Sequence, residues 1–330
     1  VALAIGLLAV NLFRPGVGVA LAAEASGLPP LAQRSVADVI VHVFPDSLAD
    51  AWARNDVLQV VVFALLFGLG AAAAGARARP VLDLCDAGAQ ILFKVTGLVM
   101  KLAPFGVAAA LAAALGKQGI AMLVPLAKLT AVFYLALACF VTLLLGFVRA
   151  VLRIPLRPFW RAAKEPVLIA FSTSTSEAAL PIALERMEEY GVPGRIVGFV
   201  LPAGYSFNLD GSTLYLALAS VFVAQAAGAG LGLRGQLVMM LTLMLSSKGI
   251  AAIPRGSLVL LAGTLASFHL PMEGAALLLG IDAILDMGRT GCNMLGNCVA
   301  SAVVAKWEGE LGQPVPSESA TNPAERRANV

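Results

Sequence analysis

Charged residues are scarce in this sequence. Asp, Glu, Lys and Arg make up 13% of its 330 residues, hydrophobic residues make up 59%, and the mean hydropathy is +0.86. A soluble domain carries about 25% charged residues, so the composition excludes a soluble fold. The formal net charge of +3 is also too small to indicate a nucleic-acid-binding surface. The composition therefore predicts an all-α integral membrane protein.

Reactive side chains are few as well. The two histidines, His42 and His269, are isolated from one another. The four cysteines lie in largely apolar stretches, where they are interpreted as small hydrophobic residues: Cys85, Cys139, Cys292 and Cys298. A serine-rich run at 172–176 would need a nearby His or Lys base to act as a nucleophile, and none is close by. We expect no metal site, no cofactor and no enzymatic activity.

The sequence contains several long apolar stretches. A bilayer crossing needs about 20 residues, and charge-free stretches of that length lie at Val57–Ala76, Leu129–Val148 and Gly211–Leu233. Val81–Leu115 is interrupted by charges, so we expect it inside a helix bundle rather than against lipid. Val1–Phe13 is too short to span and is interpreted as the second half of a helix, which predicts an amino-terminal truncation.

A basic cluster separates two of the membrane segments. Its members are Arg149, Arg153, Arg157, Arg161 and Lys164. Basic loops lie on the cytoplasmic side, which predicts the orientation of this connection.

Two polar runs interrupt apolar segments in the carboxy-terminal half. The first is Ser172–Glu177, and the second is Ser246–Ser257 within Leu237–Leu270. A polar run cannot face lipid, because nothing there would satisfy its backbone groups, whereas the tip of a re-entrant hairpin buried in protein would satisfy them. Each run precedes a helix with an internal polar patch. Two copies of one pattern predict an inverted repeat with a binding site at its interface.

The last helix carries a polar stripe. Asp282, Asp286, Arg289, Asn293 and Asn297 fall within an arc of roughly 80° on one helical face. Ionisable groups at membrane depth usually mark a path for a ligand or an ion. Arg289 could grip a carboxylate and Asp286 an ammonium, which describes a bound acidic amino acid. The alternative is a structural ion pair between Asp286 and Arg289, which leaves Asp282 and the two amides unexplained.

A second polar patch runs from Gly204 to Ser212. Glycines flanking Asn208 and Asp210 within an apolar helix predict local unwinding. Freed backbone carbonyls together with a carboxylate would suit a small cation, and Na+ at Asn208 and Asp210 is one option. The alternative is a plain kink.

Four motifs in this order resemble the glutamate/aspartate transporter family, the dicarboxylate/amino acid:cation symporters. They are Ser-Thr-Ser-Glu-Ala-Ala-Leu-Pro at 174–181, Asn-Leu-Asp-Gly at 208–211, the tip from Ser247 to Ser257, and Gly280–Thr290 followed by Asn293 and Gly296. The resemblance implies eight transmembrane helices, two re-entrant hairpins and a homotrimer that works by an elevator motion. The chain would then begin inside the third helix.

The resemblance also implies a division of the chain. Residues 1–80 would be the rest of the scaffold and trimerisation region, with part of the third helix and the fourth helix. Residues 81–118 would form a transport-domain or scaffold helix, and 119–156 a membrane helix with the basic cytoplasmic loop. Residues 157–307 would be the transport core, with hairpin 1, the unwound helix, hairpin 2 and the last helix. Residues 308–330 would be a disordered tail.

Site residues carry over motif by motif. The resemblance implies these substrate contacts: Ser176, Ser212, Ile253, Ser257, Asp286, Arg289, Thr290 and Asn293. It implies a cation region of Gly204, Ser206, Asn208, Asp210 and Ser247, to which the departures from the family pattern add Asn297 and Glu177.

Three departures from the sodium-coupled members favour the proton-coupled bacterial branch, and hence the bacterial inner membrane. Asn297 stands where those members have Asp, Leu209 where they have Met, and Glu177 where they have Ser. Glu177 or Asp210 could carry the proton, since burial favours the neutral form of a carboxyl group. Sodium coupling is the alternative.

Asp286 helps to predict which class of substrate the protein binds. The dicarboxylate members tend not to keep an Asp at this position, because their substrates lack an amino group. We therefore favour glutamate or aspartate, and symport of succinate, malate or fumarate is the runner-up. An ion channel or a structural subunit is a further alternative, which the two predicted hairpins argue against.

Overall fold

The computed structural model describes residues 1–19, 47–53, 57–102, 105, 108–109, 112, 116, 119–246, 256–268 and 270–312. Within these ranges the regular structure is helical and contains no β-strand. The predicted hairpin-tip residues Ser247 and Ile253, and most of the predicted disordered tail, lie outside the described residues.

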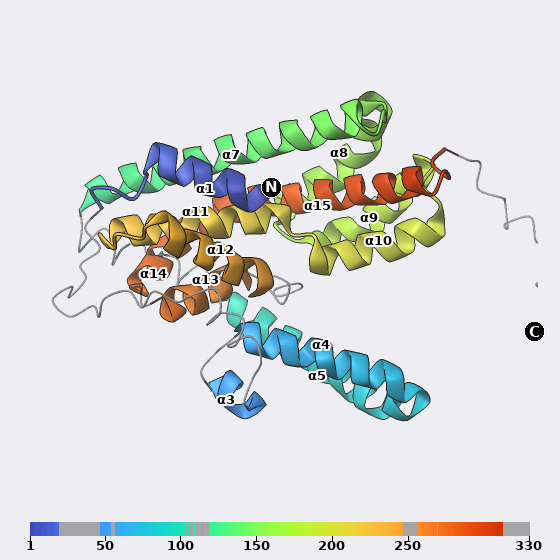
Figure 1. The fold of residues 1–330 in the computed structure, drawn as a ribbon, viewed down its shortest axis with the longest axis horizontal. Coiled ribbons are helices and arrows are strands. Elements are labelled where there is room, and N and C mark those ends of the chain that lie inside the picture. The colour runs from blue at the N-terminus through green and yellow to red at the C-terminus, as the bar shows by residue number, and fades with distance from the viewer. Residues whose placement is uncertain are drawn as a thin grey trace, which may run out of the picture.

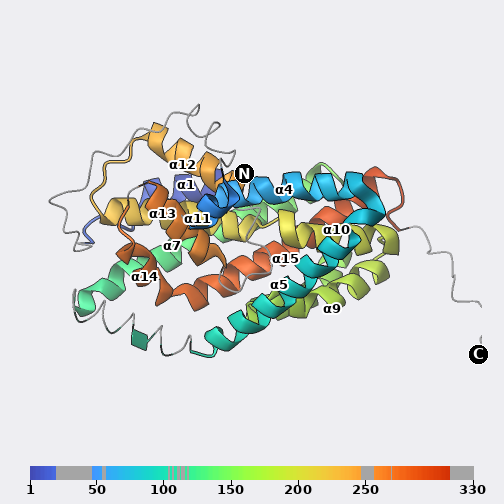
Figure 2. The same cartoon turned by 90° about the horizontal axis from the view of Figure 1, so that it is seen from below.

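The helices are long and run mostly along the long axis of the molecule (Figures 1 and 2). In chain order the α-helices are α1 (Ala2–Phe13), α3 (Leu48–Ala53), α4 (Val57–Ala74), α5 (Arg79–Met100), α7 (Leu123–Ala150), α8 (Leu156–Thr173), α9 (Ser176–Glu189), α10 (Gly194–Phe207), α11 (Asp210–Ala226), α12 (Leu233–Ser246), α13 (Gly256–Ser267), α14 (Glu273–Leu279) and α15 (Asp282–Trp307). Two 3-10 turns, Gly75–Ala78 and Ile120–Met122, precede α5 and α7.

Three helical segments have the length and apolar composition to cross a bilayer, Val62–Gly88, Ile120–Ala150 and Gly194–Ala226, although the turn between α4 and α5 divides the first. The third corrects one sequence prediction. Gly211–Leu233 is not one span, because α11 ends at Ala226 and α12 begins at Leu233. Glycines at 228, 230 and 232 fill the connection, and Gly228 has a φ of +64°, which ends a right-handed helix.

Helix α11 forms the centre of one hydrophobic cluster. Nearly all of its side chains are buried, and α1, α7, α13 and α14 pack around it. Gly6 and Gly16 bring α1 close, since a Cβ atom on either would lie 2.7 Å or 2.4 Å from an α11 carbonyl oxygen. The Gln225 amide donates to the Val10 carbonyl at 3.0 Å and accepts from the Gly16 amide at 3.1 Å. These contacts fasten α1 to α11.

Helices α8 and α9 form a helical hairpin. They pack against each other through Ala170, Ala179 and Ala183, all buried, and the chain reverses at Ser174, whose φ is +54°. Helices α10 and α15 complete this second hydrophobic cluster. Helices α12 and α13 also pack together, and broken helices follow each pair: α10–α11 after the first and α14–α15 after the second. The order of elements therefore repeats.

Helices α4 and α5 meet at the 3-10 turn Gly75–Ala78 and diverge from it in Figure 2, and α4 packs against α12. Apolar side chains on α5 are exposed, among them Leu84 (72%) and Ile91 (64%). The single chain does not bury this stretch, and its place inside a bundle stays a prediction. Its surface is the kind that lipid or another copy of the chain covers.

Candidate functional site

The polar stripe of α15 faces the protein interior. The chain breaks between α14 and α15 at Gly280 and Ile281, so α15 begins at Asp282, which is fully buried. Farther along the helix, Arg289, Thr290, Asn293 and Asn297 are also buried, and Asp286 is 16% exposed. Burying so many polar groups on one face is costly unless each has a partner. The predicted stripe is confirmed as a buried face.

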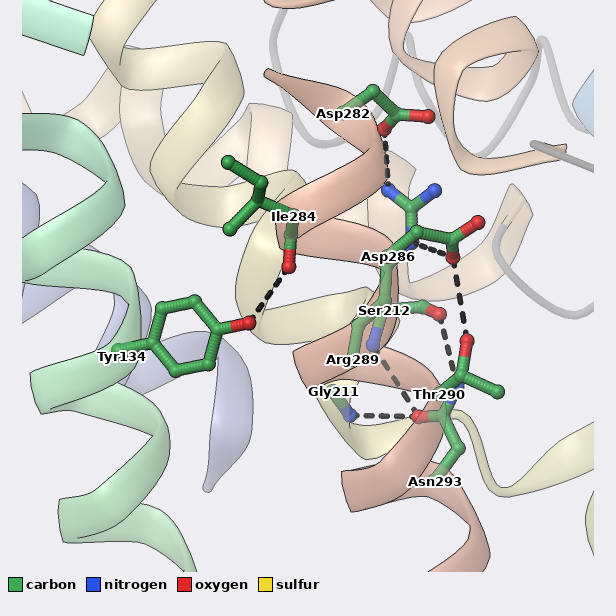
Figure 3. Close-up of polar contacts among 9 residues, drawn as sticks. All are labelled: Tyr134, Gly211, Ser212, Asp282, Ile284, Asp286, Arg289, Thr290 and Asn293. Atoms are coloured by element: carbon green, nitrogen blue, oxygen red, sulfur yellow. Dashed lines mark hydrogen bonds and ion pairs between the residues drawn. The ribbon is translucent and has the colours of Figure 1, made fainter. Parts of the chain in front are cut away.

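Arg289 lies between two carboxylates. Its Nε donates to Asp286 Oδ1 at 2.7 Å, and its Nη1 lies 3.1 Å from Asp282 Oδ1 (Figure 3). Nη1 and Nη2 form no hydrogen bond among the described residues, so the contact between Nη1 and Asp282 is an ion pair alone. The ion pair that the sequence offered as an alternative is present, and Asp282 takes part in it as well. Of the three guanidinium nitrogens, Nη2 is the one that these contacts pair with neither carboxylate.

An aromatic side chain supports this cation. The guanidinium carbon of Arg289 lies 4.6 Å from the centre of the Tyr215 ring, close enough for a cation–π contact. Sequence reasoning missed Tyr215, because nothing in an apolar helix marks which aromatic ring will meet the arginine. Its only signal was a phenol within the mostly apolar stretch Leu214–Ala226 of α11.

Helix α7 supports the same stretch of α15 from another side. The Tyr134 hydroxyl donates to the Ile284 carbonyl at 2.7 Å (Figure 3). A Cβ atom on Gly288 would lie 2.9 Å from the Phe133 ring and 3.0 Å from the Tyr134 ring. The aromatic residues of α7 therefore press directly on the α15 backbone beside Arg289.

Asn293 joins α15 to the start of α11. Its Oδ1 accepts from the amides of Gly211 at 2.8 Å and Ser212 at 3.3 Å, and its Nδ2 donates to Ser212 Oγ at 3.0 Å (Figure 3). These amides belong to the first turn of α11, where no intrahelical partner exists for them. Thr290 Oγ1 donates to Asp286 Oδ1 at 3.3 Å. The structure thus brings together five predicted substrate residues: Ser212, Asp286, Arg289, Thr290 and Asn293.

The predicted unwinding between Gly204 and Ser212 is confirmed. Helix α10 ends at Phe207 and α11 begins at Asp210, while Asn208 (φ −116°, ψ 73°) and Leu209 (φ −105°, ψ 60°) are non-helical. The Asn208 Nδ2 donates to Asn297 Oδ1 at 3.1 Å. The break therefore faces the far end of the polar stripe.

Two glycines allow this close approach. A Cβ atom on Gly204 would lie 2.5 Å from Asn297 Oδ1, and one on Gly296 would lie 2.8 Å from Asp210 Oδ2. Four residues of the predicted cation region therefore meet: Gly204, Asn208, Asp210 and Asn297. They offer amide, carbonyl and carboxylate oxygens. Ser206 lies in α10, and Ser247 is outside the described residues. Among the described residues, no cluster of three His, Cys, Asp or Glu side chains suits a metal ion.

The predicted site residues of the two hairpins form fewer contacts than those of α11 and α15. Ser176 and Glu177 begin α9, and Tyr205 donates to Glu177 Oε1 at 3.2 Å. Ser257 is buried in the first turn of α13. Within the described part of the chain, neither Ser176 nor Ser257 forms a hydrogen bond with the stripe. Ile253 falls outside the described residues.

Long apolar helices with a buried charged stripe beside an unwound helix define a helical membrane transport protein. The model of the Sodium:dicarboxylate symporter family matches residues 1–307. This chain belongs to that family, so it is a transport protein and not an enzyme.

Curated relatives fall into two groups by name. The chain is 39% identical over 321 residues to the Proton/sodium-glutamate symport protein of Geobacillus stearothermophilus, covering 95% of this chain and 76% of that protein. It is 42% identical over 316 residues to the Proton/glutamate-aspartate symporter of Bacillus subtilis (strain 168), covering 93% and 75%. It is 43% identical over 324 residues to the C4-dicarboxylate transport protein of Anaeromyxobacter sp. (strain K), covering 95% and 73%. The family is shown, and both substrate classes occur among its relatives.

Proposed function

We propose that this chain is a proton-coupled symporter of the bacterial inner membrane that imports glutamate or aspartate. In this proposal it works as a homotrimer, by an elevator form of alternating access. Helices α8–α9 and α12–α13 are its two re-entrant hairpins and belong to an inverted repeat. Because α1 is fastened to α11, the proposal places α1 with the transport core of residues 157–307 instead of with the scaffold, to which the resemblance assigned residues 1–80. The exposed apolar surface of α4 and α5 suits the scaffold of a trimer.

The observation that carries the proposal is the arrangement around Arg289. A buried guanidinium with one nitrogen left over can take a substrate side-chain carboxylate. Asp286, one turn earlier and the more exposed of its two partners, can take the substrate ammonium. The Ser and Thr hydroxyls and the hairpin tips would receive the α-carboxylate. A carboxylate site and an ammonium site one helical turn apart fit an acidic amino acid.

Coupling to the proton is supported at the other end of the stripe. Within the described part of the chain, Asp210 supplies the carboxylate next to Gly296, and position 297 is an amide whose oxygen already accepts from Asn208. A sodium ion prefers hard, negatively charged oxygen ligands, and one carboxylate has been replaced here. Relatives named for both ions keep sodium as the alternative.

Symport of C4-dicarboxylates is the second candidate function. It is favoured by the relative of that name at 43% identity, and by the ion pair that already engages Asp286 with Arg289. A substrate without an amino group would leave that pair intact.

Uptake into proteoliposomes tests the function directly. For the full-length protein, we expect a proton gradient, acidic outside, to drive saturable accumulation of labelled aspartate or glutamate. A sodium gradient alone should drive none. Accumulation of succinate but not aspartate would establish the second candidate, and passive, non-saturable flux would contradict symport altogether.

A variant separates coupling from binding in the same vesicles. If Glu177 carries the proton, Glu177→Gln should lose gradient-driven uptake and keep exchange of internal for external substrate. Unchanged proton-driven uptake in Glu177→Gln would leave Asp210 as the remaining candidate.

Replacing Asp286 with serine tests the substrate. We expect binding of aspartate to weaken by about tenfold to 100-fold, since a charge-assisted hydrogen bond contributes about 1.5–3 kcal/mol, while succinate binding changes little. Competition of each compound against labelled substrate measures the ratio. Equal losses for aspartate and succinate would refute an ammonium-binding role for Asp286.

A further inference from the structure

Five cations crowd the connection between α7 and α8. We call Arg149, Arg153, Arg157, Arg161 and Lys164 the basic corner. All five side chains are exposed, and none forms an ion pair within the part of the chain that the structure describes. Glu165 is the one acidic residue between positions 149 and 165, and it is 2.8 Å from Arg186. The two acids that approach the corner from α8 and α9, Glu165 and Glu189, are both paired with Arg186, so the corner keeps a positive charge.

The turn is built to hold these cations outward. Val148, Leu152, Ile154 and Phe159 alternate with them in sequence and are buried in the second hydrophobic cluster. The Ile154 amide donates to the Val148 carbonyl at 3.3 Å, and Arg153 has a φ of +54°, a left-handed conformation that reverses the chain. Apolar anchors on one side leave the cations on the other.

The outer face of α8 changes from basic to apolar along its length. At about 100° per residue, Arg157, Trp160, Arg161, Lys164 and Leu168 share one face about 100° wide. Trp160 is 45% exposed and Leu168 is 63% exposed. Tryptophan among cations, with an aliphatic side chain farther along the same face, is typical of the level of lipid headgroups.

The position of the basic corner in the fold agrees with the level of lipid headgroups. It follows directly on α7, the segment Ile120–Ala150 that is long enough to cross a bilayer. The α7–α8 connection lies at the same end of the molecule as the α4–α5 turn and the C-terminal end of α15 (Figures 1 and 2). The basic corner thus lies where a spanning helix leaves the membrane.

We propose that the basic corner is a binding surface for the headgroups of anionic phospholipids. Its cations bind the lipid phosphates, Trp160 lies among the headgroups, and Leu168, farther along α8, enters the region of the acyl chains. An acidic soluble partner would have no use for an exposed Trp and Leu interleaved with the cations. The proposal needs only that the chain spans a membrane, so it stands apart from the substrate and the coupling ion.

Trp160 itself reports the nearby lipid. Trp52 and Trp307 are 66% and 75% exposed, so Trp52→Phe and Trp307→Phe leave Trp160 as the only tryptophan without disturbing buried packing. The protein is reconstituted in mixtures of phosphatidylglycerol and phosphatidylcholine in which one or the other is brominated. From quenching of Trp160 we expect the anionic lipid to be preferred by about fivefold or more, and the preference to fall as salt rises.

A neutral variant and a matched control complete the experiment. Arg157→Gln, Arg161→Gln and Lys164→Gln together should bring the preference close to one. Arg77→Gln with Arg79→Gln, which neutralises exposed cations at the α4–α5 turn, should leave the preference at Trp160 unchanged. Equal quenching by the two brominated lipids in the parent protein, at low salt, would overturn the proposal whatever the protein transports. A preference that salt does not reduce would also overturn it.

Discussion

Replacing Arg289 with glutamine is expected to abolish uptake of acidic amino acids and of C4-dicarboxylates alike. Both substrate classes carry the carboxylate that this guanidinium is proposed to bind. Removing one partner of a buried, hydrogen-bonded charge pair costs about 2–5 kcal/mol, which corresponds to a loss in apparent affinity of about 30-fold to 5,000-fold. Uptake in proteoliposomes and competition binding would measure the loss. Arg289→Lys keeps the charge without the planar fork and should recover little.

The same substitution should also destabilise the fold, and this effect can be separated. Asp282 is fully buried beside Arg289, so Arg289→Gln takes the Arg289 counter-charge away from a buried carboxylate, at a cost of about 3–5 kcal/mol. Adding Asp282→Asn removes that charge, so the double variant should regain thermal stability in detergent while uptake stays absent. Recovery of uptake along with stability would show that Arg289 forms only a structural ion pair.

Sequence periodicity was sufficient to place the residues of the last helix on one face. The spacing of Asp282, Asp286, Arg289, Asn293 and Asn297 depends only on helical geometry, and their cost in an apolar setting requires an interior position. The glycines flanking Asn208 and Asp210 likewise predicted the break between α10 and α11. Residue types and their spacing along the chain were therefore enough to predict the polar face of α15 and the break between α10 and α11.

Contacts between distant segments could not be read from the same spacing. Nothing in the sequence indicated that Asn293 would accept from the Gly211 and Ser212 amides, or that Tyr215 would lie beneath Arg289. The second carboxylate at Arg289 was also missed as a partner, because Asp282 lies seven residues away, two turns along the helix. The apolar run Gly211–Leu233 misled for a different reason: absence of charge does not show that glycines end the helix inside it.

A single methyl group on Gly211 is expected to disable the site. Gly211 lies where α11 crosses α15, and a Cβ atom there would be 2.4 Å from the Arg289 carbonyl oxygen and 2.7 Å from its Cα. Backbone atoms cannot rotate away as a side chain can, so Gly211→Ala must push the two helices apart. Overpacking of this kind costs about 1–3 kcal/mol.

Pushing α11 away from α15 would impair uptake through Asn293. Moving α11 outward lengthens the hydrogen bonds from the Gly211 and Ser212 amides to Asn293 and shifts Tyr215 away from Arg289. We therefore expect uptake to fall by about tenfold or more, since small misplacements at a binding site have large effects. Thermal unfolding in detergent and uptake in proteoliposomes would measure the two effects on one preparation.

Gly198→Ala is the matched control. Gly198 lies in α10 with open space around its Cβ position, so a methyl group there meets nothing and raises the helix propensity. Its uptake should match that of the parent protein, with stability equal or slightly higher. If Gly211→Ala behaved like Gly198→Ala, the contact between α11 and α15 would not be what holds Arg289 and Asn293 in place. The start of α11 would then lose its part in the proposed binding site.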